Sequence, residues 1–183
     1  MTPILTIEIA DPEERLTPET LRWLAQTADR AVKVLGGTGE VRVKLVGDAE
    51  MTQAHAEFMD IAETTDVLTF DMSENLSDVD DGDQSPAIAL TPSGEVIVRK
   101  RVGLDVDILA CVDEAQRQVK TRGHAVEREV LLYIVHGVLH CLGFDDHDAE
   151  AAALMHRVED AVLSAVGVGP VFHSGGPTGS SGA

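Results

Sequence analysis

Runs of alternating apolar and polar residues predict strands in the first half of the chain. Strict alternation is typical of a strand with one buried face. The alternation is clearest in the segment ILTIEI near the start. A Pro-Ser-Gly turn between two short apolar segments predicts a β-hairpin. We expect strands at 4–9, 40–46, 65–70 and 107–111, and hairpin strands at 87–90 and 95–98.

Apolar residues at intervals of three and four predict five helices, concentrated toward the end of the chain. Thr17 and Pro18 supply an N-cap and a first-turn proline, and Gly36-Gly37 ends the helix that follows. The segment before Gly143 is the strongest of the five, because it is apolar nearly all round. We expect helices at 18–35, 48–59, 113–122, 126–142 and 149–166.

Strands early and helices late indicate a single α+β domain with one mixed β-sheet packed against helices. A length of 183 residues fits one domain. We place this domain at residues 1–170 and predict a disordered Gly/Ser-rich tail at 171–183. Residues 71–85 carry six acidic residues and no basic one, which predicts an exposed acidic loop.

The composition favours a cytoplasmic protein without a membrane segment. Hydrophobic residues make up 44% but aromatic residues only 3%, so aliphatic side chains and Met must build the core. No apolar run approaches the ~18–20 residues that a membrane helix needs. The first residues lack the basic region of a secretory signal, and the two cysteines lack CxxC spacing. Oligomeric state is not indicated.

The net charge of −18 opposes binding to nucleic acid, but the charges are unevenly distributed. Residues 45–98 contain thirteen acidic residues and no Lys or Arg, whereas residues 99–128 contain seven of the fourteen basic residues. Two interpretations follow. The basic segment binds phosphates, through Arg99, Lys100 and Arg101 or through Arg117, Lys120 and Arg122, or it forms an ordinary solvated helix face.

Two histidines lie four residues apart in the strongest predicted helix. His136 and His140 therefore project from one face, one turn apart, where a single metal ion could accept both imidazoles. Burying two imidazoles in so apolar a helix is costly unless each has a partner. Two explanations remain: the pair binds a metal, or backbone and carboxylate groups satisfy it.

A glycine directly after this helix gives the chain a way to turn back. Gly143 fits the C-cap region, where a left-handed residue reverses the direction of the chain. Asp145, Asp146 or His147 could then supply a third ligand, and three protein ligands with an open position are typical of catalytic zinc. In the alternative without metal, residues 145–148 only cap the next helix.

The residue after the first histidine argues against a peptidase. Zinc peptidases with an HExxH motif carry a general-base glutamate there. This chain has Gly137 instead. A peptidase would need its base from elsewhere.

Three segments together resemble the YbeY family of bacterial endoribonucleases. The sequence HGVLHCLGFD at 136–145 is similar to the family's HGxLHLxGYDH signature, and TDVLTF at 65–70 to its PTDVLSF segment. VDILAC at 106–111 resembles its GDIVIC strand, and Glu129 stands where the family has a glutamate. The resemblance covers roughly residues 40–166.

The resemblance implies a zincin-like fold and a zinc-dependent endoribonuclease specific for single strands. Its expected roles are ribosomal RNA maturation, including processing of the small-subunit rRNA 3′ end, and ribosome quality control. The expected partners are therefore RNA and the ribosome. The expected cofactor is one Zn²⁺ per chain, with His136 and His140 as ligands and catalytic residues.

Two departures from the family pattern leave alternatives open. The family's third histidine lies six residues after the second, where this chain has Asp146, with His147 one place later. Spacing favours Asp146 and ligand chemistry favours His147. The family's upstream arginine aligns with Met59, which cannot bind phosphate. A zinc hydrolase of another bond, or a ribosome-associated binding factor with little activity, are the alternative functions.

Overall fold

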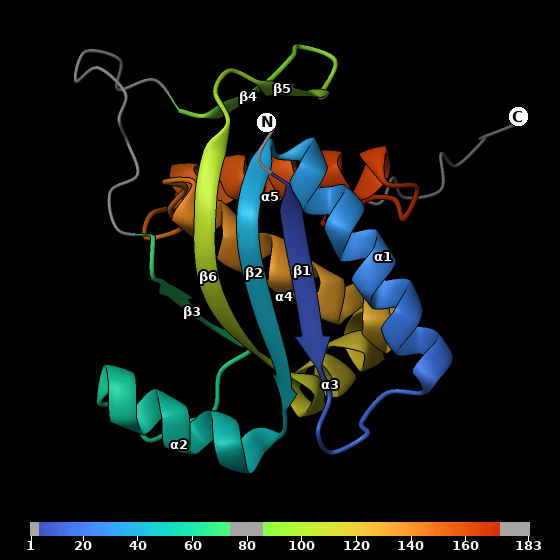
Figure 1. Cartoon of the computed structure of the whole chain (residues 1–183), viewed down its shortest axis with the longest axis vertical. Helices are drawn as coiled ribbons and strands as arrows, with labels where there is room; N and C mark the ends of the chain where they lie inside the picture. The colour runs from blue at the N-terminus through green and yellow to red at the C-terminus, as the bar shows by residue number, and fades with distance from the viewer. Residues whose placement is uncertain (1–3, 74–85, 173–183) are drawn as a thin grey trace, which may run out of the picture.

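The computed structural model describes residues 4–73 and 86–172. Its main sheet has four strands in the order β1-β2-β6-β3 (Figure 1). The first three run parallel, and β3 runs antiparallel to β6. A separate two-stranded hairpin is formed by β4 and β5. The strands are β1 Leu5–Ala10, β2 Gly37–Val46, β3 Val67–Asp71, β4 Ile88–Leu90, β5 Val96–Val98 and β6 Val102–Cys111.

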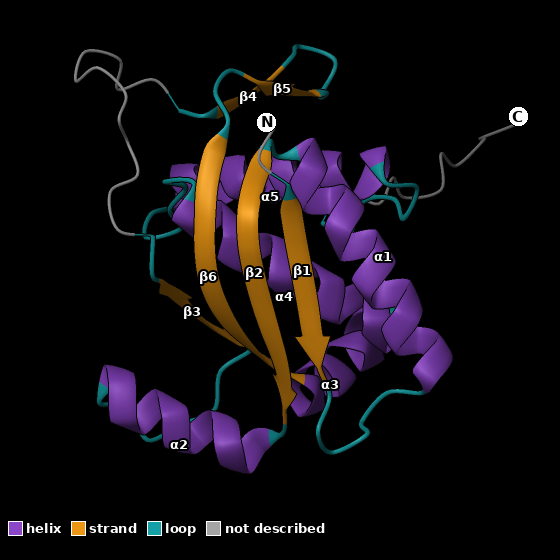
Figure 2. Cartoon of the chain, viewed as in Figure 1, coloured by secondary structure: helices purple, strands orange, loops and turns teal. Residues whose placement is uncertain are grey.

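Helices gather behind one face of this sheet, as Figure 2 shows. Helix α4 lies across the back of the sheet, contacts β3 and β6, and packs against α1, α3 and α5. Helix α2 stands at one end of the sheet, over a small second cluster of apolar residues. The helices are α1 Pro18–Val34, α2 Asp48–Met59, α3 Val112–Arg122, α4 Val126–Cys141 and α5 Ala149–Ala165.

Alternation along the strands explains why the helices cover one face only. In β2, Val41 and Val43 are buried while Arg42 between them is half-buried on the other face. Arg42 donates hydrogen bonds to Asp105 and Asp107 of β6, each at 2.5 Å. The outer face is therefore a charged cross-strand network, and the inner face supplies half of the core.

The predicted α+β class with a mixed sheet in a single domain is confirmed, but two strands are longer than predicted. Strands β2 and β6 begin at Gly37 and Val102, not at 40 and 107. The added segment of β2, GTG, has no apolar side chain, whereas the added segment of β6, VGLDV, does alternate and was overlooked. The two segments pair with each other, with Gly37 opposite Val102. Such a long-range pairing is not visible in a local pattern.

The two segments predicted to lack regular structure fall mostly outside the described residues, which exclude 74–85 and 173–183. Of the predicted acidic loop, Asp71 is the last residue of β3. Of the predicted tail, Val171 and Phe172 donate backbone hydrogen bonds to Asp160, at 2.7 and 3.0 Å. Within the described part of the chain, none of the helices has the length and apolarity to cross a membrane.

Candidate metal centre

The end of helix α4 is built by a glycine stop. Gly143 has φ +90°, a left-handed conformation that an L side chain rarely adopts. Its N–H donates to the carbonyl of His140, and the Phe144 N–H donates to the carbonyl of Leu139. These two bonds form a Schellman motif, and the left-handed glycine within it was predicted from the sequence. The motif turns the chain back toward the histidine face.

Both histidines are held through their Nδ1 atoms. His140 Nδ1 lies 3.1 Å from the carbonyl oxygen of Phe144, the residue that the Schellman motif positions. His136 Nδ1 lies 2.7 Å from Oε1 of Glu159 in α5. Metal-binding histidines commonly donate their second ring N–H to a carbonyl or a carboxylate in this way.

These partners assign the protonation of the two rings. A carbonyl oxygen only accepts, so Nδ1 of His140 carries the hydrogen, and an ionised Glu159 requires the same of His136. In the neutral form both Nε2 atoms are then lone-pair acceptors, and they face each other at 3.0 Å. Two lone pairs at this distance repel unless a proton or a metal ion lies with them. The donor set therefore fits a cation.

The loop after Gly143 adds Asp146 to the pair and directs His147 away. Asp146 Oδ2 lies 3.7 Å from His136 Nε2, and Oδ1 lies 3.9 Å from His140 Nε2. Ligand atoms of the three residues all lie within 4.8 Å of one another. The side chain of His147 is 89% exposed and lies beside Asp145, at 3.5 Å. Of the five residues that the sequence singled out, the structure brings His136, His140 and Asp146 into one group. Asp145, Asp146 and His147 form a second, fully exposed group.

Burial of Glu159 makes its bond to His136 structurally important. Glu159 is 1% exposed, and a buried carboxylate is costly unless it is paired. For His136, burial by itself lowers the pKa, but the hydrogen bond and charge of Glu159 outweigh burial and raise the pKa above its usual value. The carboxylate therefore favours positive charge on this imidazole, whether a proton or a metal ion supplies it.

Close packing explains why a glycine follows His136. A Cβ atom at Gly137 would lie 2.5 Å from Oγ1 of Thr69 in β3 and 3.3 Å from Ile108 Cδ1 in β6. Helix α4 therefore approaches the sheet at a point where only glycine fits. A glutamate at this position would require Thr69 or the helix to move. The usual base of the HExxH peptidases is therefore disfavoured here.

A polar cavity of about 470 Å³ adjoins the histidines on the side of His136 and Asp146. Asp66 lines it, and Asp66 Oδ1 also accepts a hydrogen bond from the N–H of Val67. Glu129 is fully buried at the cavity wall, where its Oε1 lies 2.7 Å from Nη1 of Arg122. Burial raises the pKa of Glu129, against the opposing effect of Arg122 and His124.

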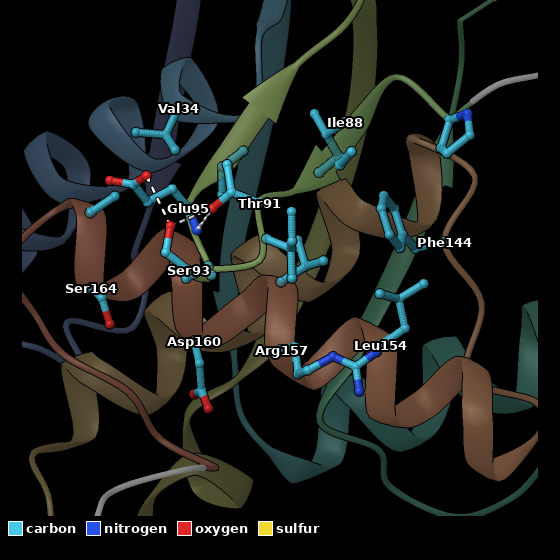
Figure 3. A pocket seen from close by; sticks show the side chains of 18 of the residues that line it. Val34, Ile88, Thr91, Ser93, Glu95, Phe144, Leu154, Arg157, Asp160 and Ser164 are labelled. Atoms are coloured by element: carbon cyan, nitrogen blue, oxygen red, sulfur yellow. Dashed lines mark hydrogen bonds between the residues drawn. The ribbon is translucent and has the colours of Figure 1, made fainter.

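A larger cavity of about 1290 Å³ lies between the β4–β5 hairpin and α5 (Figure 3). Its wall includes Phe144, Leu154 and Arg157, which Figure 3 labels. Arg99 also lines this cavity, as do Gly143 and Asp145 of the loop that carries Asp146. The cavity therefore connects the first residue of the predicted basic cluster with the loop of the metal centre.

The basic side chains of residues 99–122 differ in whether the structure gives them an acidic partner. Arg117 donates to both carboxylate oxygens of Asp48, at 2.7 Å each, so its charge is balanced. Arg99, Lys100 and Arg101 are exposed and form no ion pair with the residues that the structure describes. Met59 is 58% exposed at the end of α2 and supplies no charge.

Sequence reasoning missed Glu159 and the position of Arg122. A signal for Glu159 was present, because it lies among Met155, Val158 and Val162 on the apolar face of its helix. A carboxylate on such a face must have a buried partner. Arg122 lacked a comparable signal, since only the turn between α3 and α4 brings it against Glu129.

The fold and this centre define a class: a single α+β domain in which a buried helix presents a His-x3-His pair beside a carboxylate. Comparison with known proteins agrees. Residues 6–167 match the family model described as Endoribonuclease YbeY. The chain belongs to the YbeY family, whose curated members carry the name endoribonuclease.

Curated relatives share about a third of their residues with this chain. Endoribonuclease YbeY of Moorella thermoacetica is 35% identical over 149 residues, which are 81% of this chain and 86% of that one. The protein of the same name from Halalkalibacterium halodurans is 31% identical over 168 residues, 90% and 97% of the two chains. The solution structure of TM1509 from Thermotoga maritima matches with a TM-score of 0.50 at 21% identity, covering 87% and 91%. This structural match supports the fold alone.

The packing at Gly137 generates a stability prediction. In an exposed helix, Gly→Ala stabilises by up to ~1 kcal/mol. We expect Gly137→Ala to destabilise by about 1–3 kcal/mol instead, because its Cβ overlaps Thr69 Oγ1. Urea denaturation followed by circular dichroism measures the change. The double variant Gly137→Ala/Thr69→Ala should regain most of the loss, and a Gly137→Ala protein as stable as wild type would contradict the packing argument.

Proposed function

We propose that this chain is a zinc-dependent endoribonuclease that cuts single-stranded RNA in ribosomal RNA maturation, including the small-subunit 3′ end. The observation that carries the proposal is the convergence of two Nε2 atoms, 3.0 Å apart, with the Asp146 carboxylate. Membership of a family of endoribonucleases supports RNA as the substrate. Ribosomal RNA and the cytoplasm as its setting come from the resemblance.

In this proposal His136, His140 and Asp146 hold one zinc ion. When bound there, zinc supplies Lewis-acid chemistry, polarising a phosphoryl oxygen and activating water. Glu159 and the Phe144 carbonyl orient the two imidazoles and keep Nε2 of each free to bind. The side chain of His140 is 36% exposed and that of Asp146 is 41% exposed, so a phosphodiester can reach this end of the centre from solvent.

The basic residues 99–101 give RNA a positive approach to an otherwise acidic molecule. Arg99 shares a cavity with Gly143 and Asp145, which lead directly to Asp146. An RNA strand bound along this cavity would bring a phosphate to the metal centre. This path also replaces the phosphate contact that the family arginine would make at Met59.

Metal analysis tests the centre. We expect about one zinc per chain in the purified protein by mass spectrometry, and none in the His136→Ala/His140→Ala variant. Asp146→Ala should lose most of the zinc as well, while the matched variant His147→Ala should keep it, because His147 faces solvent. If His147→Ala loses zinc and Asp146→Ala retains it, our choice of third ligand is wrong. Absence of metal after zinc is supplied would remove the enzymatic proposal.

RNA cleavage tests the reaction. Zinc-loaded protein should cut a single-stranded oligoribonucleotide faster than the same sequence in a duplex. The His140→Ala variant should be slower by a factor of about one hundred or more, since a metal contributes several kcal/mol to transition-state stabilisation. His147→Ala is the control and should cut normally. Turnover of peptides instead of RNA would favour a metallopeptidase, and RNA binding without cleavage would favour a ribosome-associated binding factor.

The salt dependence of RNA binding tests the basic path. Reversal of Arg99, Lys100 and Arg101 to Glu should weaken binding of a single-stranded oligonucleotide. It should also flatten the plot of log affinity against log salt by about two, because each phosphate that a cation neutralises adds ~0.7 to the slope. The same number of reversals at Arg22, Arg30 and Lys33 on α1 is the control and should change the slope far less. Equal slopes in wild type and the 99–101 variant would place the RNA elsewhere.

A further inference from the structure

The polar cavity beside His136 and Asp146 is also lined by three planar side chains that lie close together. The ring of Phe172 is stacked on His156, with centroids 3.8 Å apart and planes 9° apart. The guanidinium carbon of Arg122 lies 5.1 Å from the centroid of the same ring. All three residues line the cavity. A planar group is therefore already held here by an imidazole and a guanidinium.

Proteins that recognise single-stranded RNA hold its unstacked bases with such groups, on aromatic rings and arginine planes. The cavity volume of about 470 Å³ is within the usual range for small-molecule sites. Along α4, Glu129 at one end and His136 at the other are seven residues apart, about 10 Å of helix. The cavity thus leads from the metal centre to the stack.

The charges of the cavity favour a base over a phosphate. Five carboxylate residues line it against the single arginine, Arg122, and that arginine is paired with Glu129. An additional phosphate would be repelled. An uncharged base that carries an exocyclic amino group can donate to these carboxylates, as cytosine does to Asp or Glu in other complexes. Asp66 and Glu114 are the partly accessible carboxylates on this wall.

Phe172 is attached in a way that lets its ring leave. The segment before it is held by its backbone: Asp160 Oδ1 accepts from the N–H groups of Val171 and Phe172, and Arg128 donates to the carbonyls of Gly169 and Pro170. None of these bonds uses the Phe172 ring. Rotation of the ring out of the stack therefore costs the ring contacts and leaves the segment anchored.

We propose that this cavity, between the metal centre and His156, is a subsite for one nucleotide of the RNA substrate, and that Phe172 occupies the place of its base. An incoming base displaces the Phe172 ring and stacks on His156 and Arg122. A base with an exocyclic amino group is preferred. The proposal rests on the proposed function, because it assigns the nucleotide next to the cleaved phosphodiester.

The first test follows Phe172 in the wild-type, zinc-loaded protein. Labelling with ¹⁵N-phenylalanine gives one amide signal for each of the four Phe residues. We expect cytidine 5′-monophosphate to shift the Phe172 signal, while the signal of Phe58, which is exposed on α2, stays in place. Uridine 5′-monophosphate should require about fivefold higher concentration, because it lacks the amino donor. An unchanged Phe172 signal at saturating nucleotide would overturn the proposal.

The second test removes the competing ring. Phe172→Ala should bind cytidine 5′-monophosphate about fivefold more tightly than the control Phe58→Ala, and adding His156→Ala should reverse the gain. Weaker binding by Phe172→Ala would mean that Phe172 itself supports the ligand, which contradicts displacement. Equal binding by the Phe172→Ala and Phe58→Ala proteins would also contradict it.

Comparison with the cleavage assay separates this proposal from the function on which it rests. If zinc-loaded protein cuts RNA and Phe172→Ala has the same KM as Phe58→Ala, the subsite is wrong and the endoribonuclease stands. If nucleotide shifts the Phe172 signal but no RNA is cut, the subsite is a nucleotide site and the proposed reaction is wrong.

Discussion

A single hydrogen bond, between Nδ1 of His136 and the carboxylate of Glu159, joins the two helices on which the metal centre depends. Glu159 is buried among apolar residues of α5, and His136 lies on a helix that is apolar nearly all round. Each of these polar groups would be costly alone, and the bond gives a partner to Nδ1 of His136 and to Oε1 of Glu159. Because the bond uses Nδ1, it also decides that Nε2 faces the neighbouring histidine. The same contact therefore joins α4 to α5 and fixes which nitrogen of His136 is available to a metal ion.

Local signals in the sequence were sufficient for the histidine helix and its end. The spacing of His136 and His140, the apolar residues between them and Gly143 are all properties of adjacent residues, and the structure agrees with each prediction. Glu159 and Arg122 were not found, because their roles depend on which helices become neighbours. The same limit applied to the start of β2, where the segment GTG has no apolar side chain and pairs with residues 102–104 of β6. Local sequence patterns predict whether a segment is a helix or a strand. Which side chains meet across the fold depends on contacts between segments that are distant in the sequence.

For RNA binding, the positions of the basic side chains matter as well as the net charge of −18. Many basic side chains already have carboxylate partners: Arg42 is paired with Asp105 and Asp107, Arg117 with Asp48, and Arg122 with Glu129. The exposed pairs among these add little stability, but all of them cancel charge locally. An anionic strand would bind basic side chains that have no such partner. Arg99, Lys100 and Arg101 form no ion pair with any residue that the structure describes, and Arg99 lines the cavity that reaches the loop of Asp146.

The choice between Asp146 and His147 shows how two helix ends fix the loop between them. The Schellman motif at Gly143 determines how the chain leaves α4. Asp148 accepts hydrogen bonds from the N–H groups of Glu150 and Ala151, so it must stand at the start of α5. Only four residues separate these two fixed points, and a one-residue shift would remove the cap. With Asp148 in place, Asp146 lies beside the two histidines and the side chain of His147 is exposed. This geometry is the reason for proposing Asp146, and not His147, as the third ligand.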